Sequence, residues 1–261
     1  MRLISFGTIL AGARPFTFNQ NVSSTFRGEV LCDDGSIASA FIKDLPVKEL
    51  FNELASSVIG LALGLPLPKP LLAVASPEVL TAKHIPYGAE GAHLVFASSA
   101  ADAKPVLQLI SESGAGQEIV DRLSEWHDLG GMYGFDSWVA NVDRHPGNLL
   151  LGGDDEIWMI DHGYSFSGPD WLPSTLRPDA AFRNRLGEWL TPRLSGARRG
   201  QAAAEVASFV EDAGRTDVEA LLKSNFLDEI LSEEFRPVAE FLRQRVNFIE
   251  PLSKQALDLL I

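Results

Sequence analysis

Short apolar runs separated by turn-forming residues mark the first hundred residues, and this pattern is typical of β-strands. The runs at 27–31 and 37–43 flank an Asp-Asp-Gly-Ser turn at 33–36, so together they predict a β-hairpin. Two further short strands are expected at 71–75 and 93–97. The beginning of the chain is therefore predicted to form a sheet.

One helix interrupts this strand-rich region. Apolar residues recur every three or four positions, at Val47, Leu50, Phe51, Leu54, Val58, Leu61 and Ala62. Gly64 and Pro66 then supply a stop signal. The spacing predicts a single helix over 47–63.

Helical patterns dominate beyond residue 98, after the small and polar segment 98–102, which is typical of a hinge. Helices are predicted at 117–129, 132–140, 200–211, 217–231 and 236–248. We expect Gly130 and Gly131 to break or bend the chain between the first two of them. The pattern predicts an α+β protein with a sheet-rich lobe at 1–98 and a helix-rich lobe at 99–261.

One stretch between the predicted helices carries polar residues suited to chemistry. It reads Asn-Val-Asp-Arg-His-Pro-Gly-Asn at 141–148, and two apolar runs around a Gly/Asp turn then lead to an Asp-His-Gly that begins at Asp161. The two runs predict a hairpin. If its turn centres on 153–156, Asn148 and Asp161 face each other at the open end.

This pairing predicts a magnesium site, because carboxylate and amide oxygens suit Mg²⁺, which takes its other ligands from water and phosphate. Asp143 precedes Asn148 by five residues, the interval that separates the base from a metal-binding Asn in kinase catalytic loops. We therefore assign Asp143 and its neighbour His145 to catalysis, and Asn148 and Asp161 to the metal. A surface hairpin with turn-forming Asp and Asn is the alternative, which the joint spacing disfavours.

A kinase also needs a strand lysine paired with a helix glutamate. Lys43 ends the run Ala-Phe-Ile-Lys, close to the Val-Ala-Ile-Lys of kinases. The following helix offers Glu49 and Glu53. We favour Glu53, because it lies between apolar positions, and leave Glu49 open.

The remaining nucleotide contacts are predicted around these residues. Phe96 and Ser98 lie at the end of the last strand before the hinge, and we assign them to the nucleotide pocket. Ser23 and Ser24 lie in the segment 18–26, where a phosphate loop belongs. This segment contains no glycine, so hydroxyl and backbone N–H groups would hold the phosphates there.

The pattern Asn-x-Asp-Arg-His-x-x-Asn, followed by Ile-Asp-His-Gly, resembles the HipA-like kinases, distant relatives of the phosphoinositide-3/4-kinase group. The resemblance extends over about residues 15–170 and includes Phe-Asn-Glu-Leu-Ala at 51–55 and Gly-Leu-Pro-Leu-Pro at 64–68. It implies a bilobal protein-kinase-like fold, with ATP and Mg²⁺ as cofactors and protein Ser or Thr as acceptor.

The resemblance also implies roles and partners. Asp143 would be the base, Asn148 and Asp161 the metal ligands, and Lys43 the contact to the α- and β-phosphates, held by Glu53. Characterised relatives are toxins of toxin–antitoxin pairs that modify translation factors. We therefore expect a protein substrate and consider an antitoxin or regulatory partner.

Composition and charge limit the classes of molecule that the chain is expected to bind. The chain carries 22 Lys and Arg against 35 Asp and Glu, a net charge of −13, which disfavours nucleic acid and anionic membranes as direct partners. No apolar run is long enough to span a membrane. The single cysteine, Cys32, fits a reducing compartment, so we expect a cytoplasmic protein.

Two other functions stay compatible with the sequence. One is a small-molecule or lipid kinase, because the Asp-Arg-His loop also resembles phosphoinositide kinases. The other is a nucleotide-binding pseudokinase that regulates a partner, which the glycine-free loop favours mildly. The presence of Lys43, Asp143, Asn148 and Asp161 argues against the pseudokinase.

Overall fold

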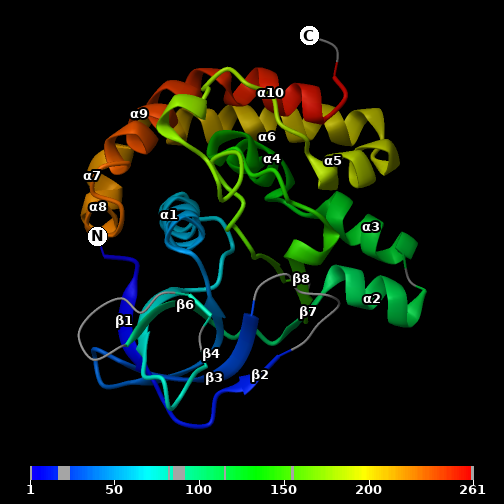
Figure 1. The fold of residues 1–261 in the computed structure, drawn as a ribbon. Helices are drawn as coiled ribbons and strands as arrows, with labels where there is room; N and C mark the ends of the chain where they lie inside the picture. The colour runs from blue at the N-terminus through cyan, green and yellow to red at the C-terminus, as the bar shows by residue number, and fades with distance from the viewer. Residues whose placement is uncertain are drawn as a thin grey trace.

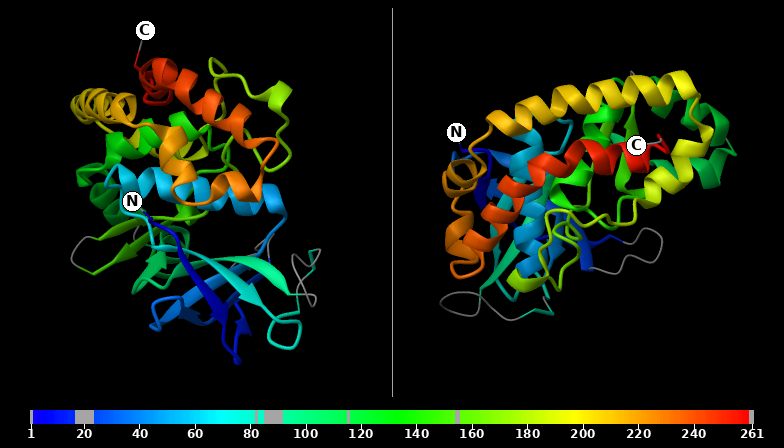
Figure 2. Two further views of the ribbon diagram at one scale, coloured as in Figure 1. Left: turned by 90° about the vertical axis from the view of Figure 1, so that its left-hand side faces the viewer. Right: turned by 90° about the horizontal axis from the view of Figure 1, so that it is seen from above.

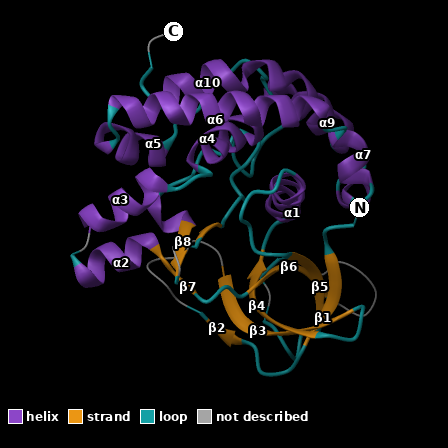
Figure 3. Ribbon diagram, turned by 180° about the vertical axis from the view of Figure 1, so that it is seen from behind, coloured by secondary structure: helices purple, strands orange, loops and turns teal. Residues whose placement is uncertain are grey.

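Most strands lie at one end of the molecule and most helices at the other (Figures 1 and 3). This arrangement confirms the predicted α+β class. The computed structural model describes residues 2–16, 24–81, 83–84, 92–114, 116–153 and 156–259. No helix in these ranges is long and apolar enough to cross a membrane.

The larger sheet has the strand order β1-β5-β6-β4-β3-β2, and a further antiparallel pairing of β1 with β3 closes it on itself. Its strands are β1 (Ser5–Ile9), β2 (Arg14–Pro15), β3 (Ser24–Cys32), β4 (Ile37–Asp44), β5 (Pro70–Ala75) and β6 (His93–Ser99). Alternate residues such as Val30, Ile42 and Val95 are fully buried and form a core inside the closed sheet. The predicted hairpin is the β3–β4 pair, with Leu31 opposite Ile37.

Helix α1 (Val47–Ala62) lies between the sheet and the remaining helices (Figure 2). All its residues from 50 to 60 are buried, because the helix packs against the sheet and also against helices on its other side. Gly64, with a φ of +77°, follows the end of α1. The predicted helix is therefore confirmed, and its burial on all sides fixes the position of the residues it carries.

The other helices form the second part of the molecule, around a central α4 that packs against α6 and α10. They are α2 (Val106–Ser113), α3 (Gly116–Glu125), α4 (Leu129–Val139), α5 (Arg185–Leu190), α6 (Gly196–Arg215), α7 (Val218–Lys223), α8 (Leu227–Ile230), α9 (Phe235–Arg245) and α10 (Ile249–Ala256). Helices α2, α5 and α10 were not predicted from the sequence. The helix predicted at 217–231 is divided into α7 and α8 at Phe226, whose φ is 61°.

The expected break at Gly130 and Gly131 is wrong, because both residues lie inside α4. The chain turns just before them, between α3 and α4. A Cβ on Gly130 would lie 2.4 Å from the carbonyl oxygen of Ala202 in α6. Glycine is thus needed there because α6 comes close to α4, and not because the helix ends.

A three-stranded sheet of β7 (Ala103–Pro105), β8 (Leu149–Gly152) and β9 (Ile157–Met159) contains the predicted second hairpin. Its register differs from the expected one. Leu149 lies opposite Met159, so the position opposite Asn148 is Ile160, whose N–H donates to the Asn148 carbonyl at 3.1 Å. The prediction that Asn148 and Asp161 face each other across the ladder is wrong, because the turn is one residue tighter than assumed, with Gly152 bonded to Glu156.

Candidate active site

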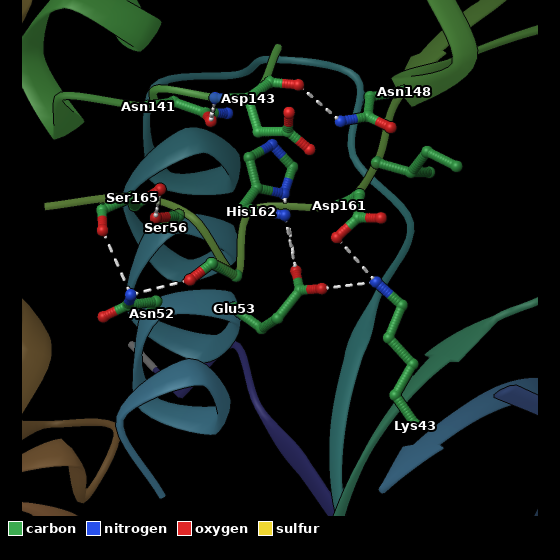
Figure 4. A network of polar contacts seen from close by, with 12 residues as sticks. Lys43, Asn52, Glu53, Ser56, Asn141, Asp143, Asn148, Asp161, His162 and Ser165 are labelled. Carbon is green, nitrogen blue, oxygen red and sulfur yellow. Dashed lines mark hydrogen bonds and ion pairs between the residues drawn. The ribbon is translucent and has the colours of Figure 1, made fainter. Parts of the chain in front are cut away.

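Lys43, at the end of β4, forms ion pairs with two carboxylates. Its Nζ lies 2.5 Å from Glu53 Oε1, in α1, and 3.0 Å from Asp161 Oδ1, after β9 (Figure 4). The side chain of Glu53 is 1% exposed and that of Asp161 is 42% exposed. The predicted pair with Glu53 is therefore present, and the second carboxylate is open to a ligand.

The charges of this cluster support each other. Burial alone would lower the pKa of Lys43, but the carboxylates of Asp161 and Glu53 outweigh it and raise the pKa above its ordinary value. Burial alone would raise the pKa of Glu53, but Lys43 and the contacts to His162 lower it well below its ordinary value. Both partners are thus charged at neutral pH.

The segment that begins at Asp161 is bonded to α1 through Asn52, Glu53 and Ser56, of which only Glu53 was assigned from the sequence. The backbone N–H of His162 donates to Glu53 Oε2 at 2.8 Å. Asn52 Nδ2 donates to the carbonyls of Gly163 and Ser165 at 2.7 and 3.0 Å, and Ser56 bonds the Ser165 hydroxyl at 2.8 Å (Figure 4). Asn and Glu adjacent on a buried helix face, as in the Phe-Asn-Glu-Leu motif, were the available signal for Asn52.

Trp171 strengthens the same connection. Its indole N–H donates to Asn52 Oδ1 at 3.0 Å, and its side chain is buried. Lys48 lies 4.8 Å from the Trp171 ring centroid and donates to the Trp171 carbonyl at 2.8 Å. These contacts fasten α1 to the chain that follows the Asp-His-Gly segment.

Asp143 lies in the loop between α4 and β8, and its backbone is held on both sides. The N–H of Asp143 donates to Asn141 Oδ1 at 3.1 Å, and Asn148 Nδ2 donates to the Asp143 carbonyl at 3.0 Å. The side chain of Asp143 is 30% exposed. The backbone of Asp143 is accordingly fixed in place, and its carboxylate is partly exposed.

Arg144, which was not assigned a role from the sequence, holds this loop through buried polar contacts. Its fully buried guanidinium pairs with Asp136 of α4, with Nε 2.9 Å from Oδ2. Its Nη1 donates to the carbonyls of Asn148 and Ile160 at 2.9 and 2.6 Å. Arg144 therefore joins the two chain segments that carry the predicted metal ligands.

His145, also assigned to catalysis, lies beside Asp143, with Nε2 3.9 Å from Asp143 Oδ2. Its Nδ1 accepts the N–H of Gly147 at 2.9 Å, within the short 3₁₀ turn Pro146–Asn148. Burial lowers the pKa of His145 below its ordinary value, so the ring is neutral at pH 7. With Nδ1 as acceptor, Nε2 carries the proton and is the atom that faces Asp143.

Of the other residues predicted for the nucleotide pocket, some lie near Lys43 and others are not described. Phe96 lies opposite Lys43 in the β4–β6 ladder, with its ring centroid 5.9 Å from Lys43 Nζ. Ser98 lies opposite Phe41 in the same ladder. Ser23 lies outside the described residues, and Ser24 is described by its backbone alone, as the first residue of β3.

The oxygen atoms near Lys43 fit a divalent metal that is shared with phosphate. Asn148 uses its amide N–H toward the Asp143 carbonyl, which leaves Oδ1 for a cation. Figure 4 shows the side chains of Asn148 and Asp161 on the same side of the site. Asp161 follows the end of β9 by two residues and has a φ of 62°, and its Oδ1 lies 3.0 Å from Lys43 Nζ.

No cluster of three His, Cys, Asp or Glu side chains within the described part of the chain could hold a metal alone. A divalent ion bound by Asn148 and Asp161 would therefore take its other ligands from nucleotide phosphates and water, as Mg²⁺ does.

Glu49, the alternative partner of Lys43, lies one helical turn before Glu53. It packs against Gly163, where a Cβ would lie 2.7 Å from Glu49 Cγ. Burial and the charge of Glu53 raise the pKa of Glu49 to about 7. Glu53 and not Glu49 forms the ion pair with Lys43.

A strand lysine paired with a helix glutamate, opposite a loop with Asp and Asn five residues apart, is the arrangement used for phosphoryl transfer in kinases. The fold and the site thus define a kinase-type phosphotransferase. A family model described as HipA-like kinase matches residues 22–195, and the chain belongs to this family. The resemblance seen in the sequence is confirmed.

Among solved structures, the chain is similar to the Helicobacter pylori proinflammatory kinase CtkA. The TM-score is 0.53 and the sequence identity 14%, with 95% of this chain and 97% of that chain covered. At this identity the similarity concerns the fold. A search of the curated proteins finds no match.

Proposed function

We propose that this chain is a protein kinase that transfers the γ-phosphoryl group of Mg-ATP to a serine or threonine hydroxyl. The observation that carries the proposal is the position of Lys43, which pairs with Glu53 and Asp161 at once. This contact joins the nucleotide-binding lysine of the sheet to the metal-binding carboxylate that follows the hairpin. Membership of the HipA-like kinase family supports it.

Each residue has a task in this proposal. Lys43 holds the α- and β-phosphates, and Glu53 orients Lys43. Asn148 and Asp161 hold the metal, which supplies charge neutralisation on the phosphate oxygens. Bound in this way, the nucleotide presents its γ-phosphate toward the loop that carries Asp143.

Asp143 acts on the acceptor. Its carboxylate accepts the proton of the acceptor hydroxyl while the hydroxyl oxygen bonds to phosphorus and the bond to the departing ADP breaks. The neutral His145 beside it presents an N–H on Nε2, suited to a phosphate oxygen. The exposure of Asp143 leaves room for a side chain of another protein.

The proposal is tested with purified protein, Mg²⁺ and ATP labelled at the γ-phosphate, with and without a cell lysate. We expect label on protein, at phosphoserine or phosphothreonine, and no label with Asp143→Asn. Asp179→Asn is the matched control, because Asp179 is exposed and pairs with the surface residue Arg177.

The other outcomes identify the alternatives. Label on an extracted small molecule or lipid instead of protein would identify a different kinase. Nucleotide binding without any transfer would identify a nucleotide-binding module, and either result would contradict the proposal.

A further inference from the structure

The carboxylate of Asp143 already has a partner that the proposed function does not use. Arg185 Nη1 forms an ion pair with Asp143 Oδ1, across 42 positions of sequence. The two side chains are 45% and 30% exposed. A cation therefore lies at the oxygen atom that an acceptor hydroxyl would have to reach.

The backbone that carries Arg185 is fixed to the catalytic loop. Arg185 is the first residue of α5, and its neighbour Leu186 is fully buried and donates its N–H to the Arg144 carbonyl at 2.7 Å. On the other side, Asn184 Oδ1 accepts the N–H of Gly187 at 2.6 Å and caps the helix. The base of the Arg185 side chain is thus held beside Asp143, while its guanidinium is half-exposed and able to change partners.

We propose that Arg185 selects the acceptor: it occupies Asp143 until an acceptor with an anionic group next to its hydroxyl offers Arg185 a new partner. A hydroxyl must come within about 3 Å of the Asp143 carboxylate to give up its proton. Water and neutral hydroxyls break the Asp143–Arg185 ion pair and offer Arg185 no new anionic partner. An acceptor flanked by a carboxylate or phosphate exchanges one ion pair for another.

The surrounding charges favour this role. The chain has a net charge of −13, so an acidic acceptor needs a local cation to approach the site. The neighbouring Arg183 is bound by both carboxylate oxygens of Glu188, with Arg183 Nη2 2.7 Å from Glu188 Oε2. Among the described residues, Arg185 forms no ion pair other than that with Asp143. Exposed ion pairs are weak, so the exchange needs only a modest gain.

This inference rests on the proposed kinase function, and its test has a readout without nucleotide. Two pools of serine peptides, with Glu or Gln on both sides of the serine and randomised elsewhere, are captured by the nucleotide-free protein and quantified by mass spectrometry. We expect wild type to retain the Glu pool about fivefold better, as one exchanged surface ion pair allows. Arg185→Ala should lose this preference and Arg185→Lys should keep part of it, whereas Arg183→Ala, the matched control, should keep all of it.

The second readout is ATP hydrolysis, in which water is the acceptor. Arg185→Ala should hydrolyse ATP several-fold faster than wild type, because Asp143 is released, and Arg183→Ala should not. The role of Arg185 would be overturned if Arg185→Ala still preferred the Glu pool. It would also be overturned if this variant hydrolysed ATP more slowly than wild type. If neither wild type nor any variant hydrolyses ATP, the peptide pools alone decide the role of Arg185. The proposed function fails only if no label reaches protein in the transfer assay described above, so the two failures are distinguishable.

Discussion

The two sides of the site are held in opposite ways. On the nucleotide side, Lys43 and Glu53 form a pair that is almost wholly buried, and α1 binds the segment after Asp161 through several further hydrogen bonds. On the acceptor side, the carboxylate of Asp143 is partly exposed and has a half-exposed arginine, Arg185, as its partner.

The two ion pairs therefore differ in how easily they exchange partners. A buried ion pair is costly to break, because the partner left behind stays charged without compensation. An exposed pair exchanges partners at little cost. In the proposed reaction, the nucleotide, which is the same in every cycle, would contact the buried pair, and the acceptor would contact the exposed pair.

The largest effect is expected from breaking the rigid side at Lys43. Lys43→Ala leaves Glu53 buried and charged, and should lower the free energy of unfolding by about 3–5 kcal/mol as well as abolish transfer. Urea denaturation measures the first effect. Lys104→Ala, at an exposed pair with Glu112 of 3.8 Å, is the control and should change the free energy of unfolding by less than about 1 kcal/mol.

A second prediction concerns the coupling between Lys43 and Glu53. Because Lys43 and Glu53 stabilise each other, the double variant Lys43→Ala/Glu53→Ala should lose less stability than the two single variants added together. Additive losses would show that the pair does not act as a unit.

An intermediate effect is expected from loosening α1 at Asn52. Asn52→Ala removes three buried hydrogen bonds, to Gly163, Ser165 and Trp171, and should destabilise the protein by about 2–4 kcal/mol. Hydrogen exchange should increase in the segment after Asp161. Asn247→Ala, an exposed asparagine bonded to the Gln244 carbonyl, is the control; equal effects of both variants would argue against α1 as the fixed support.

The smallest effect concerns pH. Burial and the charge of Glu53 raise the pKa of Glu49 from 4.5 to about 7, so the folded chain holds a proton there that the unfolded chain has lost. Between these values the folded state binds more protons, and stability must therefore fall as pH rises through 7. Since Glu49 is partly exposed, we expect a contribution of about 1–2 kcal/mol.

The difference between wild type and Glu49→Gln isolates this contribution. Relative to Glu49→Gln, wild type should lose that amount of stability between pH 4.5 and pH 8, measured by denaturation at each pH. Glu233→Gln, at an exposed position, should show no such trend. A constant difference between wild type and Glu49→Gln would mean that Glu49 titrates normally.

The sequence predicted the local elements well because their periodicity is strong. The apolar spacing of α1 and the turn of the β3–β4 hairpin were sufficient to find both, and the lysine and glutamate that these elements carry are indeed paired. The spacing of Asp143 and Asn148 likewise singled out the loop between α4 and β8, in which the Asn148 amide is bonded to the Asp143 carbonyl.

What the sequence could not predict depends on contacts between distant segments. The one-residue error in the β8–β9 register came from an assumed turn length. Asp161, which pairs with Lys43, has a left-handed backbone conformation that the sequence pattern does not predict. Arg185 pairs with Asp143 only because α5 is bonded to the catalytic loop through Leu186. Such contacts are set by tertiary packing.

The division between the two sides is tested most directly by measuring ATP affinity and phosphoryl transfer together in Asp143→Asn. Calorimetry with ATP and Mg²⁺ should give an affinity within a few-fold of wild type, because Lys43, Glu53, Asn148 and Asp161 are unchanged. Transfer of labelled phosphate should fall by at least about 10²-fold, since the base for the acceptor hydroxyl is lost. Transfer retained at the wild-type rate, or ATP binding lost along with it, would contradict the account.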